Sequence, residues 1–376
     1  MKSPRHPLTL TFIICMLVAY AIPLHAQEKV SRVSLPGTEI RSLKSTNTGE
    51  QYDIYVHPVA NADPHARYPV VFILDAQWDF PMITGIYGGL NYDEFVPNVI
   101  LVGITYSGDN PDYGSLRAMD MTPTALANVP GSGRAPQFLS FIKEELIPFV
   151  EAEYNADSAG RTLMGSSYGG LFTVYALLHE PDLFTRYVAP SSAFHWDNGV
   201  IFQYEEALGK ERSDLPVKLF MTAGEQEGVG MIDPMFKLKK ALESRNYPNL
   251  KVDATVVQGA RHSSVKPESF MRGMRYVFAP DTLQLAPELL APVAGKYKLD
   301  IPEPEEIILT ITQEGNQLFA ESQWDWGKIE LFAESETTFF FEQFNGRIMI
   351  ERNGDEMINK LKIDLGSVLT AHRIEE

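Results

Sequence analysis

The sequence predicts an α/β protein, with a mostly parallel sheet covered by helices on both faces, followed by a small all-β domain. Continuous apolar runs, typical of strands buried on both sides, alternate with segments of helical spacing up to about residue 280. A glycine-flanked serine at residues 165–169 separates one such run from an apolar helix. Beyond residue 290 the helical spacing disappears, and short apolar runs separated by turn residues replace it.

The first domain begins with an antiparallel hairpin over residues 38–60, where polar and apolar residues alternate around Gly49-Glu50. Buried strands are expected at residues 68–75, 99–104, near 162, and at 187–189, 217–221 and 252–257. Helices are expected at residues 80–95, 138–154, 171–178 and 233–245. In a parallel sheet of this kind, ligands bind beyond the carboxyl ends of the strands.

The pattern changes near residue 281, where Pro280, Pro287 and Pro292 indicate a linker. Short apolar runs then alternate with the hairpin turn signals Gly315-Asn316, Asn345-Gly346 and Asn353-Gly354. We therefore expect a signal peptide at residues 1–26, the α/β domain at 27–280, a linker at 281–290 and a small all-β domain at 291–376.

The N-terminus has the layout of a secretory signal peptide. Lys2 and Arg5 precede an apolar run over residues 8–22, and Leu24-His25-Ala26 gives a cleavage site before Gln27. An uncleaved anchor is the alternative, but the run is shorter than the roughly 20 residues that span a bilayer. The sequence thus predicts an exported protein, periplasmic or secreted, with no transmembrane anchor after signal removal and without its one cysteine, Cys15.

The chain is strongly acidic, with 32 basic and 49 acidic residues and a net charge of −17. Removing Lys2 and Arg5 with the signal peptide brings the net charge to −19, because 30 basic residues then face the same 49 acidic ones. Such a surface repels nucleic acid and anionic lipid, so neither is an expected partner.

Residues 165–169 read Gly-Ser-Ser-Tyr-Gly, the G-x-S-x-G pattern of a nucleophile elbow centred on Ser167. A nucleophilic serine stands on a tight strand-to-helix turn, and small neighbours avoid clashes there. The strand near residue 162 and the helix at 171–178 provide that context. A glycine-rich turn with an incidental serine is the alternative.

A serine hydroxyl needs a general base, and the chain order Ser, acid, His is expected for this kind of elbow. The mature chain has six histidines: His57, His65, His179, His195, His262 and His372. Of these, His262 follows the last strand of the predicted sheet, which is the position expected for the base. The acid is expected after the strand at residues 217–221, where Glu225, Glu227 and Asp233 compete; Glu227 is preferred and Glu225 is second.

The developing oxyanion needs two N–H donors. The residue after the nucleophile, Tyr168, supplies one, and the loop after the strand at residues 68–75 supplies the other, which predicts the N–H of Gln77.

Several motifs in order are similar to those of the putative-esterase family of α/β-hydrolases, which includes siderophore esterases, feruloyl and acetyl-xylan esterases, esterase D and the antigen 85 acyltransferases. The resemblance covers residues 38–279. The motifs are PVVFILD at 69–75, RAMDMTPT at 117–124, FLSFIKEELIP at 138–148, GSSYGG at 165–170, PSSAFHW at 190–196 and HSSVKP at 262–267. The last two are closest to the siderophore-esterase branch.

The resemblance implies an α/β-hydrolase fold with Ser167 as nucleophile, His262 as base and Glu227 as acid, where many members have aspartate. Some siderophore esterases use only a Ser–His dyad. By the same analogy His195 and Trp196 face the cleft and contact substrate, or else pack the loop. Arg134 meets a substrate carboxylate or phenolate, or else lies on the surface.

These observations predict an exported serine esterase that hydrolyses a carboxylic ester, with a siderophore ester or an acylated or feruloylated glycan as substrate. One alternative is an acyltransferase acting on a sugar or lipid. The other is a non-catalytic binding protein with the same fold. No cofactor is expected, and no metal-binding spacing such as H-E-x-x-H occurs.

Overall fold

The computed structural model describes residues 33–302, 306–323, 327–343, 346–353 and 357–374. The predicted signal peptide at residues 1–26, including Cys15, lies outside the described residues. The chain separates into a unit of residues 1–36 and a unit of residues 37–376, which contains all the elements named below.

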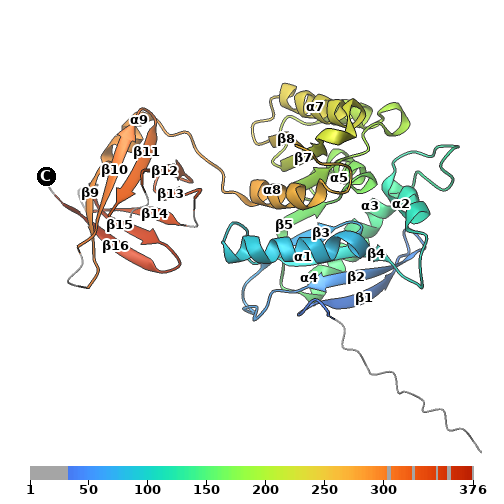
Figure 1. The fold of residues 1–376 in the computed structure, drawn as a ribbon, viewed down its shortest axis with the longest axis horizontal. Helices are drawn as coiled ribbons and strands as arrows, with labels where there is room; N and C mark the ends of the chain where they lie inside the picture. The colour runs from blue at the N-terminus through green and yellow to red at the C-terminus, as the bar shows by residue number, and fades with distance from the viewer. Residues whose placement is uncertain (1–32, 303–305, 324–326, 344–345, 354–356, 375–376) are drawn as a thin grey trace, which may run out of the picture. The chain divides into compact units, whose positions relative to one another are not determined.

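An eight-stranded sheet forms the centre of the first part of the chain (Figure 1), in the order β1-β2-β4-β3-β5-β6-β7-β8. Strands β1, β2 and β4 pair antiparallel, and every pairing from β4 to β8 is parallel. The strands are β1 (Glu39–Lys44), β2 (Gln51–His57), β3 (Tyr68–Ile73), β4 (Ile100–Tyr106), β5 (Ala156–Met164), β6 (Arg186–Pro190), β7 (Lys218–Gly224) and β8 (Lys251–Val257). The predicted hydrolase-type α/β fold is therefore confirmed.

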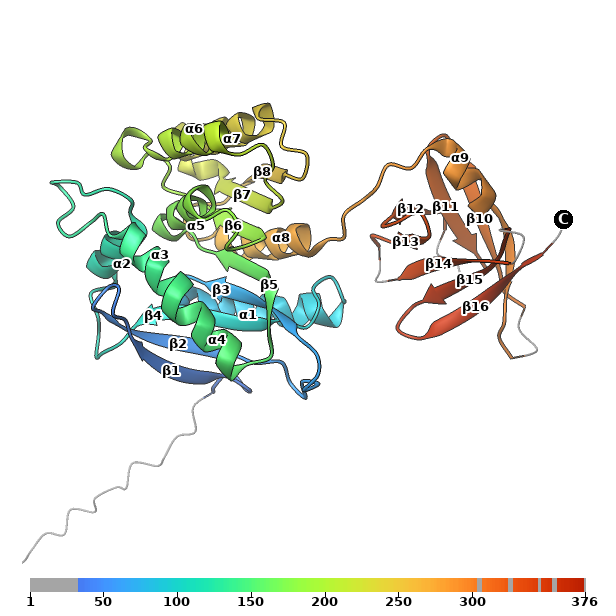
Figure 2. The same cartoon turned by 180° about the vertical axis from the view of Figure 1, so that it is seen from behind.

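Helices cover both faces of this sheet (Figure 2). They are α1 (Ala76–Tyr92), α2 (Tyr113–Met121), α3 (Ala135–Phe141), α4 (Ile147–Glu153), α5 (Tyr168–His179), α6 (Ile201–Glu211), α7 (Val229–Ser244) and α8 (Lys266–Phe278). The alternating side chains of β3 show why two layers form. Phe72 packs into a core shared with α3 to α7, whereas Ile73 packs into a second core with α1 and α8. Strands buried on both faces explain the continuous apolar runs in the sequence.

Helix boundaries differ from the expected ones in several places; α7 and α5, for example, begin four and three residues earlier than expected. Helix α1 begins at Ala76, four residues before the expected start, because Asp75 in the left-handed conformation (φ 56°, ψ 40°) turns the chain directly from strand to helix. The helix expected at residues 138–154 is divided into α3 and α4 by a π-helical stretch, Ile142–Leu146. Helices α2, α6 and α8 lie outside the segments that were expected to be helical.

The last part of the chain is a closed antiparallel barrel, in the order β10-β11-β12-β13-β14-β15-β16-β9. Its strands are β9 (Gly295–Leu299), β10 (Ile308–Glu314), β11 (Gln317–Ser322), β12 (Ile329–Ala333), β13 (Thr338–Phe340), β14 (Arg347–Arg352), β15 (Ile358–Asp364) and β16 (Val368–Ile374). The short helix α9 (Pro287–Leu290) precedes it. Inward-facing side chains such as Tyr297, Phe339 and Leu361 fill the interior, which makes the barrel a packed core. This confirms the predicted all-β structure.

Candidate active site

The turn between β5 and α5 has the geometry of a nucleophile elbow. Ser167 adopts φ 64° and ψ −118°, a strained conformation for a residue with a side chain. The turn is so tight that a Cβ on Gly165 would lie 2.8 Å from the carbonyl carbon of Gly169. A Cβ on Gly170 would clash with Ser192 Oγ and lie 3.1 Å from the carbonyl oxygen of Gly165. The glycines therefore permit backbone contacts that hold Ser167, which is half-buried, at the carboxyl end of the sheet.

His262 and Glu227 meet at the same edge of the sheet, in the loops after β8 and β7. His262 Nδ1 lies 2.5 Å from Glu227 Oε1, and the Glu227 side chain is only 4% exposed. Glu227 Oε2 accepts hydrogen bonds of 2.7 Å from Ser191 Oγ and from the N–H of Gly224. Burial raises the pKa of Glu227, but the hydrogen bonds from Ser191, Gly224 and His262 outweigh it and leave the pKa below its ordinary value. Glu227 is therefore held as a carboxylate facing an imidazole.

The other two acid candidates are not at this position. Glu225 is exposed and its Oε2 accepts a 2.9 Å hydrogen bond from the N–H of Gly259. Asp233 is exposed on α7. Of the three carboxylates that the sequence left open, Glu227 is the one that contacts His262.

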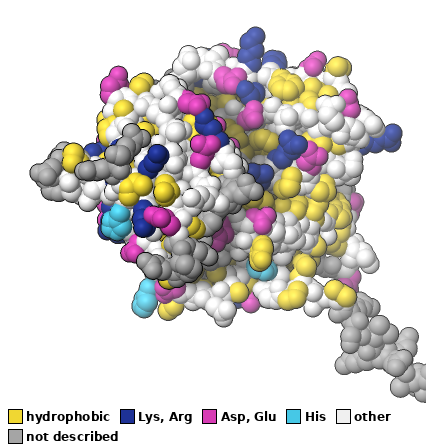
Figure 3. Space-filling view, turned by 60° about the vertical axis from the view of Figure 1, so that its left-hand side comes forward, with side chains coloured by type: hydrophobic (Ala, Val, Ile, Leu, Met, Phe, Trp, Pro, Cys, Tyr) yellow, Lys and Arg dark blue, Asp and Glu magenta, His cyan; other side chains and the backbone are white. Residues whose placement is uncertain are grey.

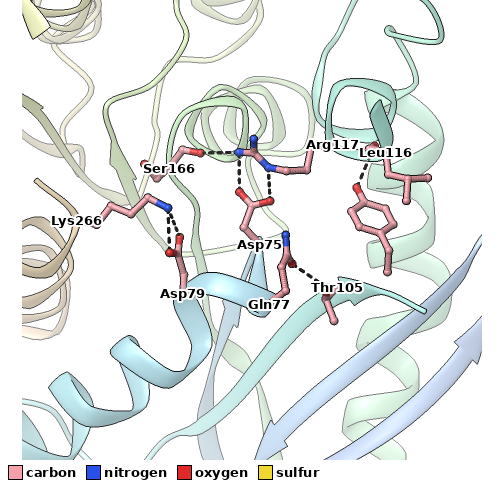
Figure 4. A network of polar contacts seen from close by, with 9 residues as sticks. Asp75, Gln77, Asp79, Thr105, Leu116, Arg117, Ser166 and Lys266 are labelled. Atoms are coloured by element: carbon pink, nitrogen blue, oxygen red, sulfur yellow. Dashed lines mark hydrogen bonds and ion pairs between the residues drawn. The ribbon is translucent and has the colours of Figure 1, made fainter. Parts of the chain in front are cut away.

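The two expected oxyanion donors lie at the first turns of helices. Tyr168 is the first residue of α5 and Gln77 is the second of α1, and the first N–H groups of a helix have no intrahelical partner. The side chain of Gln77 is held by Thr105, whose Oγ1 donates a 2.7 Å hydrogen bond to Gln77 Oε1 (Figure 4). Helix N-termini favour negative charge, so both elements suit an anionic oxygen.

A family model described as "Putative esterase" matches residues 45–263, more than half of the chain. The chain belongs to this esterase family. It is 31% identical over 266 residues to the ferri-bacillibactin esterase BesA of Bacillus subtilis, covering 66% of this chain and 92% of BesA.

Solved structures of related proteins agree with the assignment of this chain to the esterase family. The BES protein from Bacillus cereus is 27% identical with a TM-score of 0.62, covering 66% of this chain and 97% of that one. The siderophore hydrolase EstB from Aspergillus nidulans is 24% identical with a TM-score of 0.57, over 67% of this chain and 99% of that one. The latter likeness shows the common fold.

Two of the three expected substrate contacts, Trp196 and Arg134, have partners within the protein. Trp196 is buried, packs edge-on against Tyr168 at 5.4 Å between ring centroids, and donates a 3.0 Å hydrogen bond to Thr124 Oγ1. Its neighbour His195 is exposed. Arg134 donates to the carbonyl of Thr48 and lies 3.8 Å from a Glu50 oxygen. Trp196 and Arg134 are thus engaged in packing and internal polar contacts, and the substrate role of these two residues and of His195 stays a prediction.

Arg117 also belongs to the site, although its sequence context predicts no role for it. Its guanidinium pairs with both carboxylate oxygens of Asp75, the Nη2–Oδ2 distance being 2.8 Å, and lies 3.4 Å from the carbonyl oxygen of Ser166 (Figure 4). It also lies over the rings of Trp78 and Tyr168, at 5.4 and 5.6 Å from their centroids. Arg117 therefore joins the turn between β3 and α1 to the elbow. The motif at residues 117–124 contained it, but a pairing across 42 residues has no local signal.

Across the parts of the chain that the structure describes, no three His, Cys, Asp or Glu side chains are grouped so that they could hold a metal ion. In the same residues, every helix is too short or too polar to cross a bilayer.

Proposed function

We propose that this esterase is an exported serine hydrolase that cleaves a siderophore ester through an acyl-enzyme on Ser167. The observation that carries the proposal is the hydrogen bond between His262 Nδ1 and the buried carboxylate of Glu227. This bond fixes the imidazole tautomer whose Nε2 carries no proton, so Nε2 can accept one from the serine. The chain order Ser167, Glu227, His262 is that expected for the elbow.

In the first half-reaction Ser167 Oγ attacks the ester carbonyl while His262 Nε2 takes its proton. The carboxylate of Glu227 stabilises the resulting imidazolium, and the N–H groups of Gln77 and Tyr168 bind the oxyanion. The bond to the leaving alcohol then breaks, and His262 returns the proton to that oxygen. In the second half-reaction a water attacks the acyl carbonyl while His262 takes its proton. The bond between the acyl group and Ser167 Oγ then breaks, and His262 returns the proton to Oγ as the acid product leaves.

The substrate class rests on the relatives. Those with significant similarity include esterases named for ferri-bacillibactin, triacetylfusarinine C and enterobactin, all siderophores. The acidic surface opposes a strongly anionic ferric siderophore, so iron-free and ferric forms should be compared directly. Feruloylated and acetylated glycans are the contrasting substrates. Export is inferred from the sequence pattern at residues 1–26.

The test compares two neighbouring serines. Ser167→Ala should lower kcat/KM for an activated aryl ester and for the siderophore ester by more than about 10³-fold, because the nucleophile is lost. Ser166→Ala is the matched control, since Ser166 Oγ is buried and has no hydrogen-bond partner among the described residues. A fluorophosphonate should label wild type and Ser166→Ala but not Ser167→Ala. Full turnover by Ser167→Ala would overturn the mechanism, and faster cleavage of feruloyl or acetyl glycans would overturn the substrate class.

A further inference from the structure

A buried ion pair joins the first turn of α1 to the start of α8, close to the loop that carries His262. Lys266 Nζ lies 2.9 and 3.1 Å from the two carboxylate oxygens of Asp79 (Figure 4). The side chain of Asp79 is 2% exposed and that of Lys266 is 17% exposed. Neither residue belongs to the proposed catalytic set.

Each residue of the pair lies close in sequence to a residue of the proposed catalytic set. Asp79 is two residues after Gln77 in the first turn of α1, and Lys266 is the first residue of α8, four residues after His262. The segment between His262 and Lys266 is a compact turn, in which the N–H of Val265 donates a 2.9 Å hydrogen bond to the carbonyl of Arg261. A constraint on Lys266 is therefore transmitted to His262 over a short, internally bonded segment.

The pair joins two helices that follow strands far apart in the sheet. Helix α1 follows β3 and α8 follows β8, and strands β5, β6 and β7 lie between these two. The bodies of α1 and α8 share an apolar core that includes Ile83, Phe270 and Met274. Apolar contacts are non-directional, so they hold the helices together without fixing the ends precisely. The ion pair adds a directional bond at the ends where Gln77 and His262 lie.

Stability alone gives a weak reason for this pair. A lysine at a helix N-terminus is opposed by the helix dipole. The pKa of Asp79 is raised, mainly because the carboxyl group is buried and also because Asp75 lies nearby. The positive charges of Lys266 and, more weakly, Arg117 oppose this rise. Replacing a buried ion pair by apolar side chains is often neutral or stabilising, whereas the fixed geometry of the pair is lost.

We propose that Lys266 is a positioning residue whose ion pair with Asp79 sets His262 relative to the oxyanion donor of α1. This inference rests on the proposed function. A displacement of about 1 Å in a reacting group costs on the order of 10²-fold in rate. Misplacement affects transition-state alignment more than substrate binding, so kcat should fall while KM changes little.

The experiment uses the full chain with four variants. Lys266→Met removes the cation at similar length, and Lys266→Arg keeps a cation that can bind the carboxylate. Asp79→Leu/Lys266→Met removes both charges, so no buried charge is left unpaired if the single variant folds poorly. Arg245→Met is the control, because it removes the cation that pairs with a similarly buried carboxylate, that of Glu205 in α6.

Rates are expressed per site titrated by fluorophosphonate, so that loss of folded protein is not counted as loss of rate. We expect kcat to fall about 10- to 100-fold in Lys266→Met and in the double variant, with KM within about twofold of wild type. Lys266→Arg should keep kcat within about threefold, and Arg245→Met should keep it unchanged while lowering Tm. Wild-type kcat per site in Lys266→Met, or its recovery in the double variant, would overturn the inference.

A second measurement does not depend on turnover. Amide hydrogen exchange of residues 258–265 should be faster in Lys266→Met than in wild type and unchanged in Arg245→Met. If wild type shows no Ser167-dependent hydrolysis, the proposed function fails, and exchange alone decides whether Lys266 holds the loop. Equal exchange in wild type and Lys266→Met would then refute the positional role.

Discussion

At the scale of single residues, the site depends on where side chains point. Glu225 and Glu227 are two residues apart in one loop, yet Glu225 accepts a hydrogen bond from the N–H of Gly259, whereas Glu227 is hydrogen-bonded to His262. The short 3-10 turn Glu225–Glu227 separates their directions. The sequence places both carboxylates after β7, but only the turn geometry distinguishes them.

The choice of Glu227 can be tested by an amide. In Glu227→Gln, the side-chain oxygen is expected to face the N–H of Gly224, since the amide nitrogen there would oppose another donor. The NH₂ would then donate to His262 Nδ1 and leave the proton on Nε2, where the base must be free. We expect kcat to fall about 10²- to 10⁴-fold.

Glu225→Gln is the matched control for that substitution, and its kcat per titrated site should stay within about twofold of wild type. Full activity in Glu227→Gln would indicate that a Ser–His dyad suffices. A larger loss in Glu225→Gln than in Glu227→Gln would assign the acid to Glu225.

At the scale of elements, α2 connects the site to the core of the sheet. From this helix Arg117 reaches Asp75 at the turn between β3 and α1, and Asp120, on the next turn of α2, is fully buried. Asp120 Oδ2 accepts a 2.7 Å hydrogen bond from the hydroxyl of Tyr52 in β2. Burial raises the pKa of Asp120 to about 6, against lowering contributions from the Tyr52 hydrogen bond and the charge of Arg134. The anchor of α2 is therefore a carboxyl group that titrates well above its ordinary range.

This shift predicts a pH-dependent stability difference. The folded state holds the Asp120 proton more tightly than the unfolded state, so Asp120 lowers stability as the pH rises from about 4 to about 6, and the loss persists above that range. Asp120→Asn cannot ionise and escapes the loss. The unfolding free energy of Asp120→Asn minus that of wild type should increase by at most about 3 kcal/mol between pH 4 and pH 8. Urea unfolding at both pH values measures it, and a difference independent of pH would contradict the prediction.

Most of the strands of the sheet could be predicted from the sequence, but few of the contacts between distant residues could. Buried strands and the elbow have local signals, namely apolar runs and glycines beside Ser167. Helices α2, α6 and α8 were missed, although α8 does have a local signal: Phe270, Met274 and Val277 recur at helical spacing, and Pro267 lies at its start, where proline is favoured. The Asp79–Lys266 pair joins residues 187 positions apart, and only the assembled fold brings them together.

At the scale of the whole molecule, the α/β part and the barrel each have a hydrophobic core of their own. The family match ends at residue 263, and the BES protein from Bacillus cereus covers only 66% of this chain although 97% of its own length is included. On the face shown in Figure 3, acidic and basic side chains are interspersed. The boundaries at residues 280 and 291 stay predictions.

Truncation tests this division. A chain that stops after Pro280 should fold and hydrolyse a small activated ester with kcat within about threefold of the full chain, because the cores of the α/β part are retained. A chain that stops after His262 is the control. It lacks α8, including the buried residues Phe270 and Met274, and should lose cooperative unfolding in circular dichroism. Loss of folding in the longer truncation would show that the barrel is part of one cooperative unit.

Closure of the barrel also affects how the chain avoids self-association. Every described barrel strand has two neighbours, so no barrel strand offers an unpaired row of backbone groups to another chain. Only β1 and β8 are edges of the open sheet. Both carry charged side chains, with Glu39 and Lys44 in β1 and Lys251 and Asp253 in β8. Charged side chains at such edges discourage the addition of a strand from another chain. Protection against edge-to-edge aggregation of the sheet therefore depends on the charges of these two short strands.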